Sequence, residues 1–108
     1  MPAGTWDLRI EQGATFTQTY TVADDGWTWD GWAAHAQIRA TPADTGALLL
    51  DLDPYLTVAG ATVQLSIPAD VTRTLTRNGV WDLEMDAGDG TVLRLLQGKV
   101  HVSPEVTR

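Results

Sequence analysis

The chain has 108 residues, no cysteine and a formal net charge of −7. A chain of this length can bury one hydrophobic core, so we expect a single domain over residues 1–108. The acidic excess opposes nucleic acid and anionic membranes as partners, because both require a basic surface. The lack of cysteine excludes disulfides and thiolate metal sites.

The N-terminus, Met1–Asp7, has neither a basic start nor an apolar run, so we expect no secretory signal. The longest apolar run, Ala47–Leu50, is too short to cross a bilayer. We therefore expect a protein that is made in the cytosol and that has no membrane partner.

Alternation of apolar and polar residues predicts strands along the first half of the chain. It marks residues 5–11, 15–22 and 32–39 as strands. Asp24–Gly26 and Thr41–Gly46 are typical of a turn and a loop. Leu48, Leu50 and Leu52 predict a fourth strand, which ends at Asp53-Pro54.

The second half contains strands at 63–67, 81–86 and 92–102. Between them, residues 68–77 have Val71 and Leu75 four positions apart, which predicts a short helix or a few turns. The last two strands should form a hairpin, and Gly98 should mark a bulge or a close approach. We predict an all-β single sandwich of about seven to eight mostly antiparallel strands with one short helix near 68–77.

The order of several blocks resembles a family of small β-sandwich virion proteins of tailed phages. The blocks are Ile10–Phe16 (IEQGATF), Asp24–Gly26, Asp30–Trp32, Ala36–Arg39 (AQIR), Ile67–Thr72 (IPADVT), Gly79–Glu84 (GVWDLE) and Gly90–Thr107. They are similar to the N-terminal domain of upper-baseplate proteins and to tail and fibre connector proteins.

The resemblance covers nearly the whole chain and implies a virion structural part that joins one component to another. It implies no catalytic residue, and we expect none, with no cofactor. It further implies a homo-oligomeric ring or array, assembled in the host cytoplasm. Any receptor-binding or fibre region is expected on a separate chain. The aromatic segment Trp27-Thr28-Trp29 is richer than the family pattern.

Ionisable residues give weak signals for chemistry. His35 and His101 are expected on outward strand faces, where His35 could meet Asp86, but their spacing does not indicate a metal site. Asp51 and Asp53 should share one strand face, and we interpret them as solvated. We therefore predict no metal site and no enzyme activity.

Tryptophan is the unusual component, with five residues in the chain. Trp6, Trp32 and Trp81 are in phase with apolar strand positions, which favours core packing. Trp27 and Trp29 lie in a turn-rich loop. They either project together into solvent or fold back over the sandwich and bury one ring.

We predict that this loop binds a partner through Trp27, Trp29, Asp25 and Asp30. The favoured function is a non-enzymatic adaptor in the tail or baseplate, or at a fibre attachment point, that binds other virion proteins. The alternatives are a capsid-decorating or head-fibre-base protein, and a carbohydrate-binding module that uses the tryptophan pair.

Overall fold

The computed structural model describes residues 3–24, 26–43 and 46–107. The strands are β1 (Gly4–Thr5), β2 (Leu8–Glu11), β3 (Phe16–Thr21), β4 (Ala33–Arg39), β5 (Leu48–Asp51), β6 (Leu56–Ala59), β7 (Thr62–Ile67), β8 (Gly79–Asp86) and β9 (Val92–Ser103). The helices are the 3₁₀ turn η1 (Asp53–Tyr55) and α1 (Ala69–Thr72). No helix in the described part of the chain is long and apolar enough to cross a membrane.

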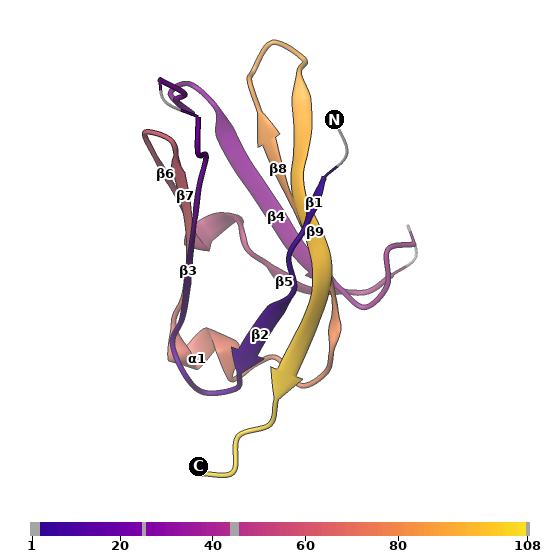
Figure 1. The fold of residues 1–108 in the computed structure, drawn as a ribbon. Helices are drawn as coiled ribbons and strands as arrows, with labels where there is room; N and C mark the ends of the chain where they lie inside the picture. The colour runs from indigo at the N-terminus through magenta and orange to yellow at the C-terminus, as the bar shows by residue number, and fades with distance from the viewer. Residues whose placement is uncertain (1–2, 25, 44–45, 108) are drawn as a thin grey trace.

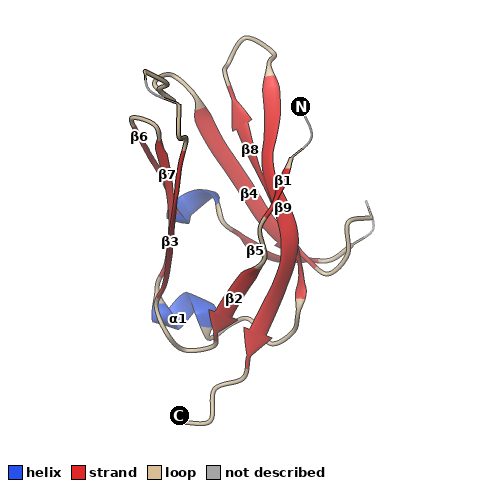
Figure 2. Ribbon diagram, in the orientation of Figure 1, coloured by secondary structure: helices blue, strands red, loops and turns tan. Residues whose placement is uncertain are grey.

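The strands form two packed sheets, which confirms the predicted all-β, sandwich-like fold. The large sheet has the order β1-β9-β8-β4-β5, and β2 also pairs with β9. The small sheet has the order β3-β7-β6. The predicted β8–β9 hairpin is present, whereas β1 and β2 run parallel to β9. Figures 1 and 2 show the two layers, with α1 at the end from which the C-terminus leaves.

The core lies between the sheets and follows the alternation of the sequence. On β8, every second side chain points inward, and Trp81, Leu83 and Met85 are buried. Alternate residues of the small sheet meet them from the opposite layer, because side chains alternate between the two faces of a strand. The buried members of the small sheet are Val63, Leu65 and Ile67.

Trp81 joins the N-terminal segment to this core. Its indole Nε1 donates a 2.7 Å hydrogen bond to the carbonyl oxygen of Trp6. Its ring also stacks on Tyr20, with 6.0 Å between ring centroids. A Cβ added to Gly98 would overlap the same Trp6 carbonyl, so this strand position requires glycine. The predicted close approach at Gly98 is confirmed, and the irregularity of β8–β9 pairing lies instead beside Leu83 and Glu84.

Trp6 itself corrects an expectation. Its side chain is 44% exposed, although its phase with Leu8 and Ile10 predicted a core position. The prediction was wrong because the β-pairing is interrupted between β1 and β2, where Trp6 lies. There its ring meets the Tyr20 ring in a T-shaped contact, with 5.7 Å between centroids and an interplanar angle of 86°.

Three elements also differ from the sequence prediction. The fourth strand ends at Asp51, and Asp53 begins η1, so the two carboxylates do not share a strand face. An unpredicted strand, β6, pairs with β7 through a turn at Gly60, whose φ of 57° favours glycine. The predicted helix at 68–77 is the single turn α1.

Thr72 anchors α1 to the chain between β2 and β3. Its side chain is fully buried, and its Oγ1 accepts a hydrogen bond from Gly13 N and lies 2.8 Å from the Ala14 carbonyl oxygen. The chain between β2 and β3 is therefore bound to α1. This contact closes one end of the sandwich.

Replacing Trp81 with alanine should lower the free energy of unfolding by about 3–5 kcal/mol, because it leaves a large cavity in the core. Trp27→Ala should cost far less, since Trp27 is 37% exposed. Urea melts of the two variants measure the difference. Equal losses of stability would contradict the placement of these two rings.

Candidate functional site

The loop between β3 and β4 contains the residues that the sequence predicted to bind a partner. Of the four, Asp25 lies outside the described residues, Trp27 and Asp30 are exposed, and Trp29 is buried. Glycines with φ near 85° at Gly26 and 83° at Gly31 bracket the aromatic segment. These left-handed turns fold the loop over the end of the sandwich opposite α1 (Figure 1).

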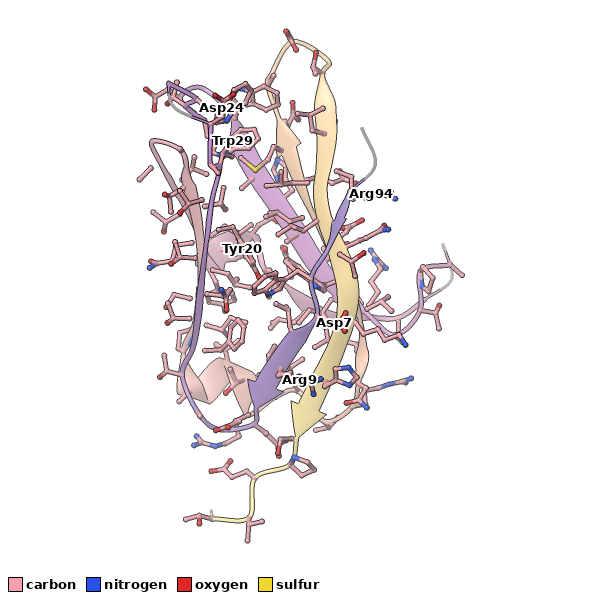
Figure 3. The ribbon with its side chains drawn as sticks, in the orientation of Figure 1. Asp7, Arg9, Tyr20, Asp24, Trp29 and Arg94 are labelled. Atoms are coloured by element: carbon pink, nitrogen blue, oxygen red, sulfur yellow. The ribbon has the colours of Figure 1, made fainter. Side chains whose placement is uncertain are left out.

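Trp29 anchors this loop. Its side chain is 2% exposed, so of the two arrangements that the sequence left open, joint projection of both tryptophans into solvent does not occur. The loop instead folds back over the sandwich and buries one ring, which is the other arrangement that the sequence left open. Trp29 N donates a 2.8 Å hydrogen bond to Gly60 O in the turn between β6 and β7. This bond ties the loop to the small sheet, and Figure 3 shows Trp29 directed between the layers.

The loop tryptophans form one packed cluster with Trp32. Trp29 meets Trp27 and Trp32 edge-on, with ring centroids 5.1 and 5.2 Å apart. Trp27 and Trp32 are 6.4 Å apart. Trp29 Nε1 is buried and has no hydrogen-bond partner within the described ranges. The cluster therefore presents Trp27 on a base of two further aromatic rings.

Trp27 shares its end of the sandwich with other exposed apolar side chains. Val92 is 51% exposed and Leu93 is 39% exposed at the start of β9. The strand register places Val92 opposite Asp86, and Asp86 opposite Ala33, which follows Trp32. As successive residues of β9, Val92 and Leu93 lie on opposite faces of the large sheet, Leu93 beside the inward Met85 and Val92 beside Asp86. We call the end of the sandwich that carries Trp27, formed by the loop between β3 and β4 and by the β8–β9 turn, the tryptophan end.

Carboxylates lie in both loops of the tryptophan end. Asp24 and Asp30 lie in the tryptophan loop, and Figure 3 shows Asp24 at its tip. Asp86 and Asp89 lie at the β8–β9 turn. Hydrogen bonds from Thr91 lower the pKa of the Asp89 carboxyl. Apolar groups with an acidic border suit a partner whose surface has an apolar pocket and a basic rim.

A second candidate site is a groove of about 700 Å³ on the outer face of the large sheet. Two of its three cationic side chains already have polar partners. Arg94 lies 3.4 Å from Asp82, and Arg39 donates to the Gly46 carbonyl and to Gln37. Because Arg39 and Arg94 already have partners in this chain, the groove is a weaker candidate than the tryptophan end.

His35 lies beside this groove and pairs with Asp53, a partner that the sequence analysis did not identify. The Nδ1–Oδ2 distance is 2.8 Å, and the other Asp53 oxygen accepts a hydrogen bond from Ala36 N. The turn η1 brings Asp53 there, which no strand pattern indicates. No group of three or more His, Asp or Glu side chains in the described ranges could hold a metal ion.

The hydrogen bond to Asp53 raises the pKa of His35 above 6.5, and the charges of Asp86 and Glu84 act in the same direction. This stabilisation of the protonated ring is present below pH 6.5 and is lost as pH rises through the raised pKa. The side chain is 51% exposed, so solvent weakens the effect on stability.

Asp53→Asn should lower the pKa of His35, because the amide keeps a hydrogen-bonding oxygen but loses the charge. An NMR titration of the ring Cε1–H signal measures this pKa. The chain has two histidines, so a His101→Gln background leaves a single ring signal to follow. An unchanged His35 pKa in Asp53→Asn would contradict the pairing.

No family model matches this chain, and neither does any curated protein. The candidate site therefore stands on its own geometry: an exposed tryptophan, held on two packed rings and bordered by carboxylates, at the end of a β-sandwich.

Proposed function

We propose that this protein is a non-enzymatic virion structural protein of a tailed phage, which binds other virion proteins through the tryptophan end. The observation that carries the binding proposal is the exposed Trp27 ring on the buried Trp29. The virion class rests on the family resemblance of the sequence blocks. The proposed place of assembly is the host cytoplasm, with a position in the tail or baseplate, or at a fibre attachment point.

The base beneath Trp27 favours tight contact with a partner. Trp29 is held by its packing and by its 2.8 Å hydrogen bond to Gly60 O. Trp27 N is held by the Asp24 carbonyl at 3.1 Å. A side chain that is already ordered loses less conformational entropy when it enters a pocket, so more of its contact energy contributes to affinity. Large aromatic side chains held in this way are typical interface hot spots.

The negative charge of the chain favours a partner with a basic surface. The chain carries −7, and Asp24, Asp30, Asp86 and Asp89 border the tryptophan end. A partner with lysines or arginines around an apolar pocket would associate faster and more specifically than an acidic one. A placement on the capsid could use the same surface, and it is a variant of this proposal.

The single exposed ring favours a protein pocket over a sugar. Carbohydrate binding through the tryptophan pair would use the faces of both rings. Trp29 is 2% exposed, so only Trp27 remains available, and its ring also meets Trp32. We therefore favour protein recognition over the carbohydrate-binding alternative.

Trp27→Ala should reduce incorporation of the protein into particles at least about tenfold, the loss typical of a hot-spot residue. The measurement is quantitative mass spectrometry of purified virions that are produced with either variant. A single substitution is preferred, because changing the buried Trp29 would also unfold the loop.

Leu48→Ala is the matched control. Leu48 is 49% exposed but lies on β5, at an edge of the large sheet. The Leu48→Ala protein should be incorporated into particles at the wild-type level. A folded Trp27→Ala protein that joins particles at the normal level would exclude the tryptophan end as the binding surface. Absence of the wild-type chain from virions would exclude the virion function. Loss of glycan-array binding alone would favour the carbohydrate alternative.

A further inference from the structure

The small sheet carries no charge. Its strands β3, β7 and β6 read FTQTYT, TVQLSI and LTVA, without aspartate, glutamate, lysine, arginine or histidine. Its outer face is formed by hydroxyl and amide side chains, and Thr17 meets Ser66 at 3.2 Å while Thr21 meets Thr62 at 3.3 Å. The large sheet, in contrast, carries charges on its outer face. A chain of net charge −7 thus has one neutral layer.

β3 is the edge of that neutral layer, and among the described strands it pairs only with β7 (Figure 1). Backbone groups of an antiparallel strand point alternately to its two sides. Val22 N bonds to Ala61 O, and the register is continuous from Thr21 to Phe16. Gln18 and Tyr20 therefore bond to β7. The N–H and C=O groups of Thr17, Thr19 and Thr21 point to the side without a partner strand, where the Thr19 carbonyl accepts a long, exposed 3.5 Å hydrogen bond from its neighbour Gln18 Nε2.

This free side lacks the features with which proteins usually block sheet edges. Such features are charges, prolines, bulges and very short strands. β3 has none of them over its 6 residues, and its pairing with β7 shows no register shift. By contrast, β6 has 4 residues, β5 carries Asp51, and β2 carries Arg9 and Glu11.

We propose that the β3 edge pairs with β3 of a second copy of this chain, antiparallel and about a two-fold axis at Thr19. Thr19 would face Thr19 of the other copy, and Thr17 would face Thr21. Each pair would exchange backbone N–H and C=O hydrogen bonds, which joins the two small sheets into one. The pairing is independent of the proposed function, because β3 is not part of the tryptophan end.

Two observations favour a second copy over an unrelated strand. The Thr-x-Thr-x-Thr pattern of residues 17–21 is symmetric about Thr19, so an antiparallel copy faces threonine with threonine, a favourable cross-strand pair. Two chains of charge −7 also repel, and the neutral sheet is where they can approach with least repulsion. A two-fold contact closes after two copies and leaves both tryptophan ends free.

Sedimentation velocity of the full chain over micromolar to millimolar concentrations tests the proposal. We expect a reversible monomer–dimer equilibrium, since an edge contact of this length is small compared with stable interfaces. A wild-type protein that stays monomeric over the whole range would overturn the proposal. Growth beyond the dimer would also overturn it.

Thr19→Lys should weaken the dimer about fivefold or more, because it places like charges directly opposite each other across the axis. Gln64→Lys is the matched control, since Gln64 is the register partner of Thr19 on β7 and lies on the same exposed face. The two Gln64 positions would be three strand spacings apart, roughly 14 Å, where salt screens their repulsion. This control should dimerise as the wild type does.

An equimolar mixture of Thr19→Lys and Thr19→Glu should restore dimers, because the opposite charges then meet at the axis. Thr19→Pro removes an outward N–H without breaking the β3–β7 ladder, and it should also abolish pairing. Circular dichroism shows whether each variant is folded. Equal weakening by Thr19→Lys and Gln64→Lys would assign the contact to the sheet face and refute edge pairing. Failure of the charge-swap mixture to dimerise would refute the axis at Thr19.

Discussion

The hydrogen bond from the Trp81 indole to the Trp6 carbonyl holds the N-terminal segment on the large sheet at the gap between β1 and β2. A bond of this kind contributes about 0.5–1.5 kcal/mol, but here it also fixes a path. Gly98 lets the backbone of Trp6 approach β9, and Asp7 Oδ1 accepts a hydrogen bond from Lys99 N. β1 and β2 then lie parallel to β9, and the chain crosses at the Thr72 contact to begin β3. The position of the small sheet depends on this crossing.

Charge divides the two layers of the sandwich. The outer face of the large sheet carries paired ions, such as Arg94 with Asp82, whereas the strands of the small sheet carry none. Carboxylates gather at the tryptophan end, beside the exposed Trp27 ring. The proposed partner surface and the proposed self-pairing edge thus use opposite physical principles. One depends on complementary charge and the other on its absence.

Strand periodicity predicted the fold class, the β8–β9 hairpin and the inward side of β8, because alternation reports burial directly. It failed at Trp6, which has the phase of a core residue but lies between two short strands. It did not decide whether the loop rings project or fold back, since the bond from Trp29 N to Gly60 O joins segments far apart in sequence. The pairing of His35 with Asp53 was missed because Asp53 lies in η1 and not in a strand. Strand alternation therefore does not indicate where its side chain points.

Amide hydrogen exchange along β3, followed by NMR at low and high protein concentration, tests the self-pairing edge most directly. The account predicts that the Gln18 and Tyr20 amides are protected at both concentrations, since they bond to β7. The Thr17, Thr19 and Thr21 amides should exchange freely in dilute solution and become protected as concentration rises. Protection of these threonine amides in dilute solution, or exchange rates that do not change with concentration, would contradict it.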